Sequence, residues 1–212
     1  MSLQIVVQHD QRRAELLPRL LPHLPGAQVV TAEPGSCWRT YLACLSALDD
    51  DASHLLCIQD DAVPCLDFLP TVERAIAAKP AEILCLFVPG VNVLQRAVLD
   101  ACNRGEHWAE LPKQSFVPVV ANVYPRETVE ALLQFEAQNP FNARRISDDA
   151  NIAEFVRRTG RRVLATVPSL VDHDDSVRSL VGTQHTHGRN PTRVAACWTG
   201  EDWSPSEIDW TH

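Results

Sequence analysis

A short apolar run that ends in two aspartates is the feature that most constrains the fold of this chain. Residues 55–58 (Leu-Leu-Cys-Ile) are all apolar and are followed by Gln59, Asp60 and Asp61. The run is too short for a helix and does not alternate with polar residues, so it indicates a buried strand of a mostly parallel sheet. Ligands of open α/β sheets bind at the carboxyl ends of such strands, where these carboxylates are expected.

Two adjacent buried carboxylates repel each other and lose their solvation, so the sequence predicts a positive partner for Asp60 and Asp61. A hard divalent cation that carries a phosphorylated substrate is one such partner. An acidic turn or a helix cap after the strand is the alternative interpretation, and the run alone does not separate the two.

Strand and helix patterns alternate along the chain. Short apolar runs predict further strands at 5–7, 27–31, 83–88, 116–123 and 162–167. Apolar residues at helical spacing predict helices within 13–24, 37–48, 67–78, 126–138 and 148–159. The pattern loosens over residues 91–114.

This alternation predicts an α/β fold in which a doubly wound, mostly parallel sheet is flanked by helices. The chain of 212 residues has room for one substantial domain of this kind. We expect that domain over residues 1–180 and an irregular C-terminal tail, rich in polar residues, over 181–212.

Composition excludes some classes of partner. The formal net charge of −8 argues against broad electrostatic binding to nucleic acid, although not against a local basic patch. No stretch approaches the roughly 20 uninterrupted apolar residues that span a bilayer, and the N-terminus lacks the pattern of a signal peptide. The seven cysteines include no Cys-x-x-Cys pair, so we expect free thiols and a cytoplasmic location.

Two more acidic segments lie at predicted element boundaries. Asp148 and Asp149 follow Ser147, a predicted N-cap, at the start of a helix. Residues 172–175 (Asp-His-Asp-Asp) follow the last predicted strand. Taken alone, the first segment is equally typical of acids that complement a helix dipole, and the second of a surface ion cluster.

In their order and spacing, the three acidic segments resemble the GT-A class of nucleotide-sugar glycosyltransferases. That class has a strand that ends in a DxD-type motif, a later helix that opens with an acidic pair, and a histidine after the last core strand. Residues 168–173 (Pro-Ser-Leu-Val-Asp-His) are similar to the Pro-Ser-Leu-Val-x-His segment of the lipopolysaccharide-type enzymes, and the compact chain also resembles small phage-type glycosyltransferases. The resemblance covers roughly residues 5–180.

The resemblance implies transfer of a sugar from a nucleoside-diphosphate donor, expected to be UDP-linked, to an acceptor hydroxyl. It implies Asp61 and His173 as ligands of Mn²⁺ or Mg²⁺, which would neutralise charge on the leaving diphosphate. It also implies Asp149, or failing that Asp148, as the general base of an inverting reaction.

Further residues are expected to contact the donor. Gln59 stands at the first DxD position, where an amide supplies no charge, and Asp60 is left to contact the ribose or a metal-bound water. Arg39 could reach the nucleotide from its helix, with an exposed helix charge as the alternative. Arg178, Arg189 and Arg193 could clamp the diphosphate.

The expected acceptor is a glycan hydroxyl or a hydroxymethylated pyrimidine in phage DNA, and the acidic net charge weighs against DNA. A phage source would place the protein in the host cytoplasm. Two other functions stay open: a non-catalytic module that binds a nucleotide sugar or a metal, and a metal-dependent phosphohydrolase. The hydrolase would need further carboxylate or histidine ligands close to Asp60 and Asp61.

Overall fold

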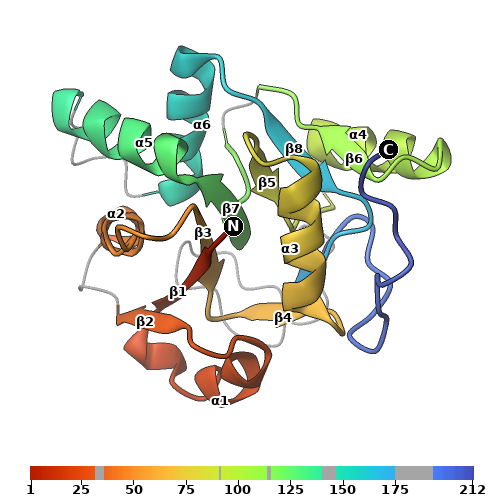
Figure 1. Cartoon of the computed structure of the whole chain (residues 1–212), viewed down its shortest axis with the longest axis horizontal. Coiled ribbons are helices and arrows are strands. Elements are labelled where there is room, and N and C mark those ends of the chain that lie inside the picture. The colour runs from red at the N-terminus through yellow and green to blue at the C-terminus, as the bar shows by residue number, and fades with distance from the viewer. Residues whose placement is uncertain (32–35, 91, 114–115, 140–146, 175–192) are drawn as a thin grey trace.

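One seven-stranded sheet organises the molecule (Figure 1). The computed structural model describes the chain except for residues 32–35, 91, 114–115, 140–146 and 175–192 and the side chain of Asn92. The sheet has the order β2-β1-β3-β7-β5-β8-β6. Its strands are β1 (Leu3–His9), β2 (Gln28–Thr31), β3 (His54–Gln59), β5 (Ile83–Cys85), β6 (Trp108–Glu110), β7 (Ala121–Pro125) and β8 (Val163–Thr166).

The sheet is mostly parallel, as predicted. Strands β1, β2, β3, β5 and β8 run in one direction, and β6 and β7 run against them. The reversed strand β7 lies between β3 and β5, where Leu55 pairs with Tyr124 and Leu84 with Val123. The strand predicted at 116–123 begins only at Ala121. Pro118 has no N–H to donate to a strand ladder, which explains the later start.

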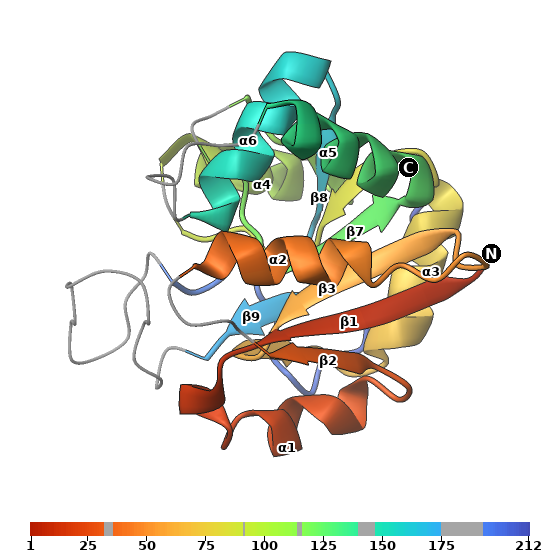
Figure 2. The same ribbon diagram turned by 90° about the vertical axis from the view of Figure 1, so that its left-hand side faces the viewer.

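Helices cover both faces of the sheet, and Figure 2 shows α2, α5 and α6 on the side of β1 and β3 opposite α1. Alternate residues of β3 supply the two faces: Leu55 and Cys57 pack into one core cluster, and Leu56 and Ile58 into the other. The first cluster takes in α2 (Cys37–Ser46), α4 (Asn92–Asn103), α5 (Arg126–Gln138) and α6 (Asp148–Thr159). The second takes in α1 (Leu17–Leu20) and α3 (Phe68–Ala78).

Two segments differ from the helices that the sequence predicts. The pattern over 13–24 yields only α1 and two short 3-10 helices, η1 (Gln11–Arg13) and η2 (Leu21–His23), because Pro18 and Pro22 interrupt the hydrogen-bond ladder. Helix α4 was not predicted, although Leu94, Val98 and Ala101 recur at helical spacing and are buried.

A two-stranded antiparallel sheet lies beside the main one and is formed by β4 (Ala62–Pro64) and β9 (Val171–His173). In its register Ala62 faces His173. Because Asp61 immediately precedes Ala62, this pairing sets the acidic end of β3 against the histidine of β9.

The C-terminal residues 193–212 pack on the domain. Pro89 forms a β-bridge with Ala195, and the Trp108 indole donates to the carbonyl oxygen of Trp210 at 2.9 Å. Trp210 is itself buried. The predicted boundary at residue 180 lies outside the described residues. Within the part that the structure describes, no helix has the length and apolar character to cross a membrane.

Candidate functional site

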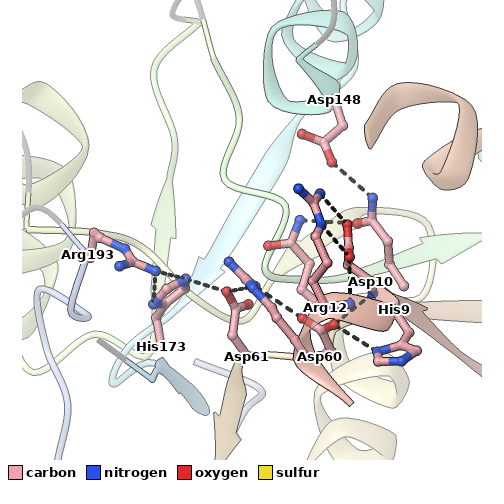
Figure 3. Close-up of polar contacts among 11 residues, drawn as sticks. His9, Asp10, Arg12, Asp60, Asp61, Asp148, His173 and Arg193 are labelled. Carbon is pink, nitrogen blue, oxygen red and sulfur yellow. Dashed lines mark hydrogen bonds and ion pairs between the residues drawn. The ribbon is translucent and has the colours of Figure 1, made fainter. Parts of the chain in front are cut away.

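The two carboxylates that follow β3 are buried at the edge where β3 and β1 end together (Figure 3). Asp60 is 4% exposed and Asp61 is 3% exposed, and both lie in the turn that leads to β4. The backbone N–H of Asp60 donates to the carbonyl oxygen of Gln8 at 3.1 Å, which ties the turn to β1. These are the burial and the position that the apolar run predicts.

Asp60 is held by groups that follow β1. Its Oδ2 accepts from His9 Nδ1 and from the backbone N–H of Asp10, each at 2.9 Å, and its Oδ1 accepts from Arg13 Nη1 at 3.1 Å. Burial raises the pKa of Asp60, and the Asp10 amide, Arg13 and His9 offset that effect only in part. Three contacts on one carboxylate make Asp60 a fixed part of the site.

Asp61 carries the stronger charge interaction. Its Oδ2 accepts from His173 Nε2 at 3.0 Å and from Arg13 Nη1. Burial acts to raise the pKa of Asp61, but His173 and Arg13 outweigh it and lower the pKa to about 2. Its other oxygen, Oδ1, is buried and accepts no hydrogen bond from any described residue.

Arg13 is the positive partner that the sequence predicts in general but does not identify. It is the last residue of η1, whose first N–H groups are capped by the Asp10 side chain, and it is 8% exposed. A signal was present, because residues that follow β1 must meet residues that follow a parallel neighbour. The sequence alone did not show that β1 and β3 are neighbours.

Besides Asp61, His173 has a positively charged neighbour, Arg193, in the C-terminal segment. Arg193 Nη2 lies 3.4 Å from Nδ1 and 3.2 Å from Nε2 of His173. With the Nε2 proton directed at Asp61, Nδ1 is the natural acceptor for Arg193. Asp172 anchors the same segment, since its Oδ1 accepts from the backbone N–H of Ala195 at 2.7 Å.

The second acidic pair opens α6. Ser147 caps the helix, with its hydroxyl accepting from the N–H of Ala150. Asp148 is 7% exposed, and its Oδ2 accepts from Gln8 Nε2 at 3.3 Å. Burial raises the pKa of Asp148. Burial, followed by repulsion from Asp148, raises the pKa of Asp149 to about 6.

Gln59 connects the two acidic pairs. Its Nε2 donates to Gln8 Oε1 at 3.1 Å, and Gln8 in turn donates to Asp148. An aspartate at position 59 would supply only acceptors and would break this relay. The departure from the DxD pattern therefore has a local physical reason.

Arg39 and Arg178 are not brought to this site by the described contacts. Arg39 lies exposed on α2, where its backbone N–H donates to the capping Ser36. Arg178 and Arg189 lie outside the described residues. These assignments stay predictions.

The described side chains at this site include atoms of the kind that bind a metal cation, but too few to complete a coordination shell from the protein alone. Asp61 Oδ1 is a buried oxygen with no hydrogen bond, and the His173 imidazole lies beside the same carboxylate. Such oxygen and nitrogen ligands suit Mn²⁺. In the described part of the chain, no group of three or more His, Cys, Asp or Glu side chains is arranged to hold a metal. A metal here would need ligands from a bound substrate or water.

No family model and no curated protein matches this chain. Among solved structures it is similar to A197 from STIV, with a TM-score of 0.53, 14% identity, and coverage of 88% of this chain and 100% of that one. It is also similar to residues 1–349 of S. aureus TarS, with a TM-score of 0.50, 12% identity, and coverage of 81% of this chain and 59% of that one.

The chain thus spans all of A197 but about 59% of the TarS chain. At these identities the likeness concerns the fold alone. The predicted α/β class, with a mostly parallel sheet flanked by helices, is confirmed by the structure.

Proposed function

We propose that this protein is a metal-dependent glycosyltransferase that moves a sugar from a nucleoside-diphosphate donor, UDP-linked in the first instance, to an acceptor hydroxyl. The observation that carries the proposal is the convergence of three acidic segments that lie far apart in the sequence. Asp61 contacts His173 at 3.0 Å, and the Gln59–Gln8 relay reaches Asp148 from the same strand end. The likeness to TarS, a glycosyltransferase, supports the same class of reaction.

Asp61 and His173 are the proposed protein ligands of Mn²⁺ or Mg²⁺, with Asp61 Oδ1 as the available oxygen. A bound divalent cation supplies neutralisation of the negative charge that develops on the leaving diphosphate. Asp60, fixed by His9 and Asp10, is the residue proposed to contact the ribose or a metal-bound water. Arg193 adds positive charge next to His173.

Asp149 is the proposed general base. Its pKa of about 6 lets it be ionised at neutral pH and still accept the proton of an acceptor hydroxyl. Asp148 is the alternative base, but its hydrogen bond from Gln8 and its deeper burial favour a positioning role. A base on the face opposite the leaving group would give inversion.

The acceptor proposed first is a glycan hydroxyl, and a hydroxymethylated pyrimidine in DNA comes second because the net charge is −8. The seven free cysteines fit a reducing compartment such as the cytoplasm.

A thermal-shift panel of UDP-, GDP-, CDP- and TDP-sugars, each with and without Mn²⁺, tests donor and metal together. We expect one donor class to raise the unfolding temperature, and to do so more strongly with Mn²⁺. A panel without any metal-dependent shift would contradict the proposal.

Transfer by an Asp149→Asn variant tests the base. We expect turnover to fall by about 10²–10⁴-fold while the Mn²⁺-dependent donor shift is kept. Glu154→Gln on the same helix is the matched control, since among the described residues Glu154 pairs with the exposed Arg157 and Arg158. Donor binding without transfer in the wild type would favour the non-catalytic module, and phosphate release without any acceptor would favour the hydrolase.

A further inference from the structure

Arg13 is the buried cation of the site, and the mechanism proposed above does not use it. Its Nη1 contacts Asp60 Oδ1 at 3.1 Å and also Asp61 Oδ2, the oxygen that His173 Nε2 approaches at 3.0 Å. One guanidinium thus contacts both carboxylates at the end of β3. Arg13 belongs to the segment that follows β1, whereas both carboxylates follow β3, and all of these groups come from this chain.

We infer that Arg13 occupies the place of the divalent cation at Asp61, that metal binding displaces it, and that the displaced guanidinium then binds the donor diphosphate. The inference rests on the proposed function and deepens it. It assigns Arg13 as a positioning residue that couples metal binding to nucleotide binding.

Displacement follows from charge. An ion bound by His173 Nε2 and by Asp61 Oδ1 must also lie close to Asp61 Oδ2, because both oxygens belong to one carboxylate and Nε2 is 3.0 Å from Oδ2. Arg13 already donates to Oδ2. Two positive groups on one buried carboxylate oxygen repel each other strongly, because little water is present to screen them. The single negative charge of Asp61 can fully compensate one of the two positive groups, but not both.

The diphosphate is the natural second partner of Arg13. A guanidinium offers paired N–H groups that match phosphate oxygens, and it keeps its charge whatever the pH. Arg13 stands on a three-residue 3-10 helix whose other members, Gln11 and Arg12, are exposed, so this helix lies at the surface. Metal and nucleotide should then each strengthen the binding of the other, to an equal degree.

Electron paramagnetic resonance of free Mn²⁺ measures this coupling directly. The wild type should bind Mn²⁺ weakly alone and about 10-fold or more tightly with UDP. Arg13→Gln should bind Mn²⁺ alone about 10-fold more tightly than the wild type, and UDP should then strengthen Mn²⁺ binding by a smaller factor than in the wild type. Arg19→Gln is the matched control, because Arg19 is exposed and, among the described residues, pairs with Asp174 at 3.4 Å.

The two possible failures are distinguishable. If the wild type binds Mn²⁺ with UDP but Arg13→Gln binds Mn²⁺ no more tightly, the displacement idea is wrong and the proposed function stands. If neither protein binds Mn²⁺ with or without UDP, the proposed function fails and the inference fails with it.

A measurement on the wild type covers the case in which Arg13→Gln does not fold. Phenylglyoxal labels accessible guanidinium groups, and mass spectrometry of peptides locates the label. The Arg13 side chain is 10% exposed and should label slowly in the metal-free protein, faster with Mn²⁺, and slowly again with Mn²⁺ and UDP. Arg12, with its side chain 68% exposed, should label under all three conditions. Arg13 labelling that saturating Mn²⁺ leaves unchanged would overturn the inference.

Discussion

The chain contains two pairs of adjacent aspartates at the site, and their surroundings differ in sign. Asp61 meets Arg13 and His173, and its pKa falls to about 2. Asp149 meets backbone groups and the neighbouring Asp148, and its pKa rises to about 6. Burial opposes ionisation of both Asp61 and Asp149, so among the described residues it is the positive partners of Asp61 that separate these two carboxylates. Asp61 is suited to hold charge, and Asp149 to exchange a proton.

The largest effect is expected from removing the charge of Asp61. Asp61→Asn leaves Arg13 buried with half of its compensation, and the free energy of unfolding should fall by about 3–5 kcal/mol at pH 7. Urea unfolding measures it. Glu106→Gln breaks the exposed pair with Arg104 and should lower the free energy of unfolding far less, because solvent screens that pair. An equal loss in both variants would mean that the buried site is no different from a surface pair.

The pH dependence of this loss has a definite sign. In the folded protein the pKa of Asp61 is about 2, below the ordinary aspartate value of 3.8. Ionised Asp61 therefore stabilises the fold fully above pH 3.8, and this stabilisation is lost as the pH falls toward 2. The stability difference between wild type and Asp61→Asn should therefore shrink over that interval in acid titrations.

The second acidic pair should behave in the opposite way. In the folded protein the pKa of Asp149 is about 6, above the ordinary aspartate value of 3.8. Ionisation of Asp149 therefore destabilises the protein as the pH rises from 3.8 through 6. Asp149→Asn should then be more stable than the wild type by about 1–2 kcal/mol at pH 7.5, once partial exposure is discounted, and equal to it at pH 3. Urea unfolding at both pH values measures the change. A destabilised Asp149→Asn at pH 7.5 would remove the contrast between the pairs.

The smallest effect is expected at the relay that joins the two pairs. Gln59→Glu removes the amide that donates to Gln8 and adds charge near Asp148, so it should cost about 1 kcal/mol at neutral pH. Gln134→Glu, on the exposed face of α5, should change stability by less than about 0.5 kcal/mol. Equal costs for the two variants would show that the relay carries no energetic weight.

The fold was largely predictable because buried strands and amphipathic helices leave local patterns. The reversed direction of β7 was not, since a strand buried on both faces has the same apolar run whichever way it points. Pro18 and Pro118 explain why one predicted helix is broken and one predicted strand is short.

The site was predictable only in part. Asp61 and His173 could be placed together because the order of the acidic segments resembles that of the GT-A glycosyltransferases. His9, Arg13 and Gln8 could not, because their roles depend on β1 and β3 being parallel neighbours. Neighbour relations in a sheet are a property of the topology, and the residue pattern within each strand does not reveal them.

The pairing of β4 with β9 also has a consequence for the order of biosynthesis. A ribosome makes β3, β4 and Asp61 long before it makes His173, and the segment that carries Arg193 emerges later still. Arg13 is made before all of them. From the moment they are made, then, the carboxylates have a cationic residue that was made before them, and the imidazole is added much later.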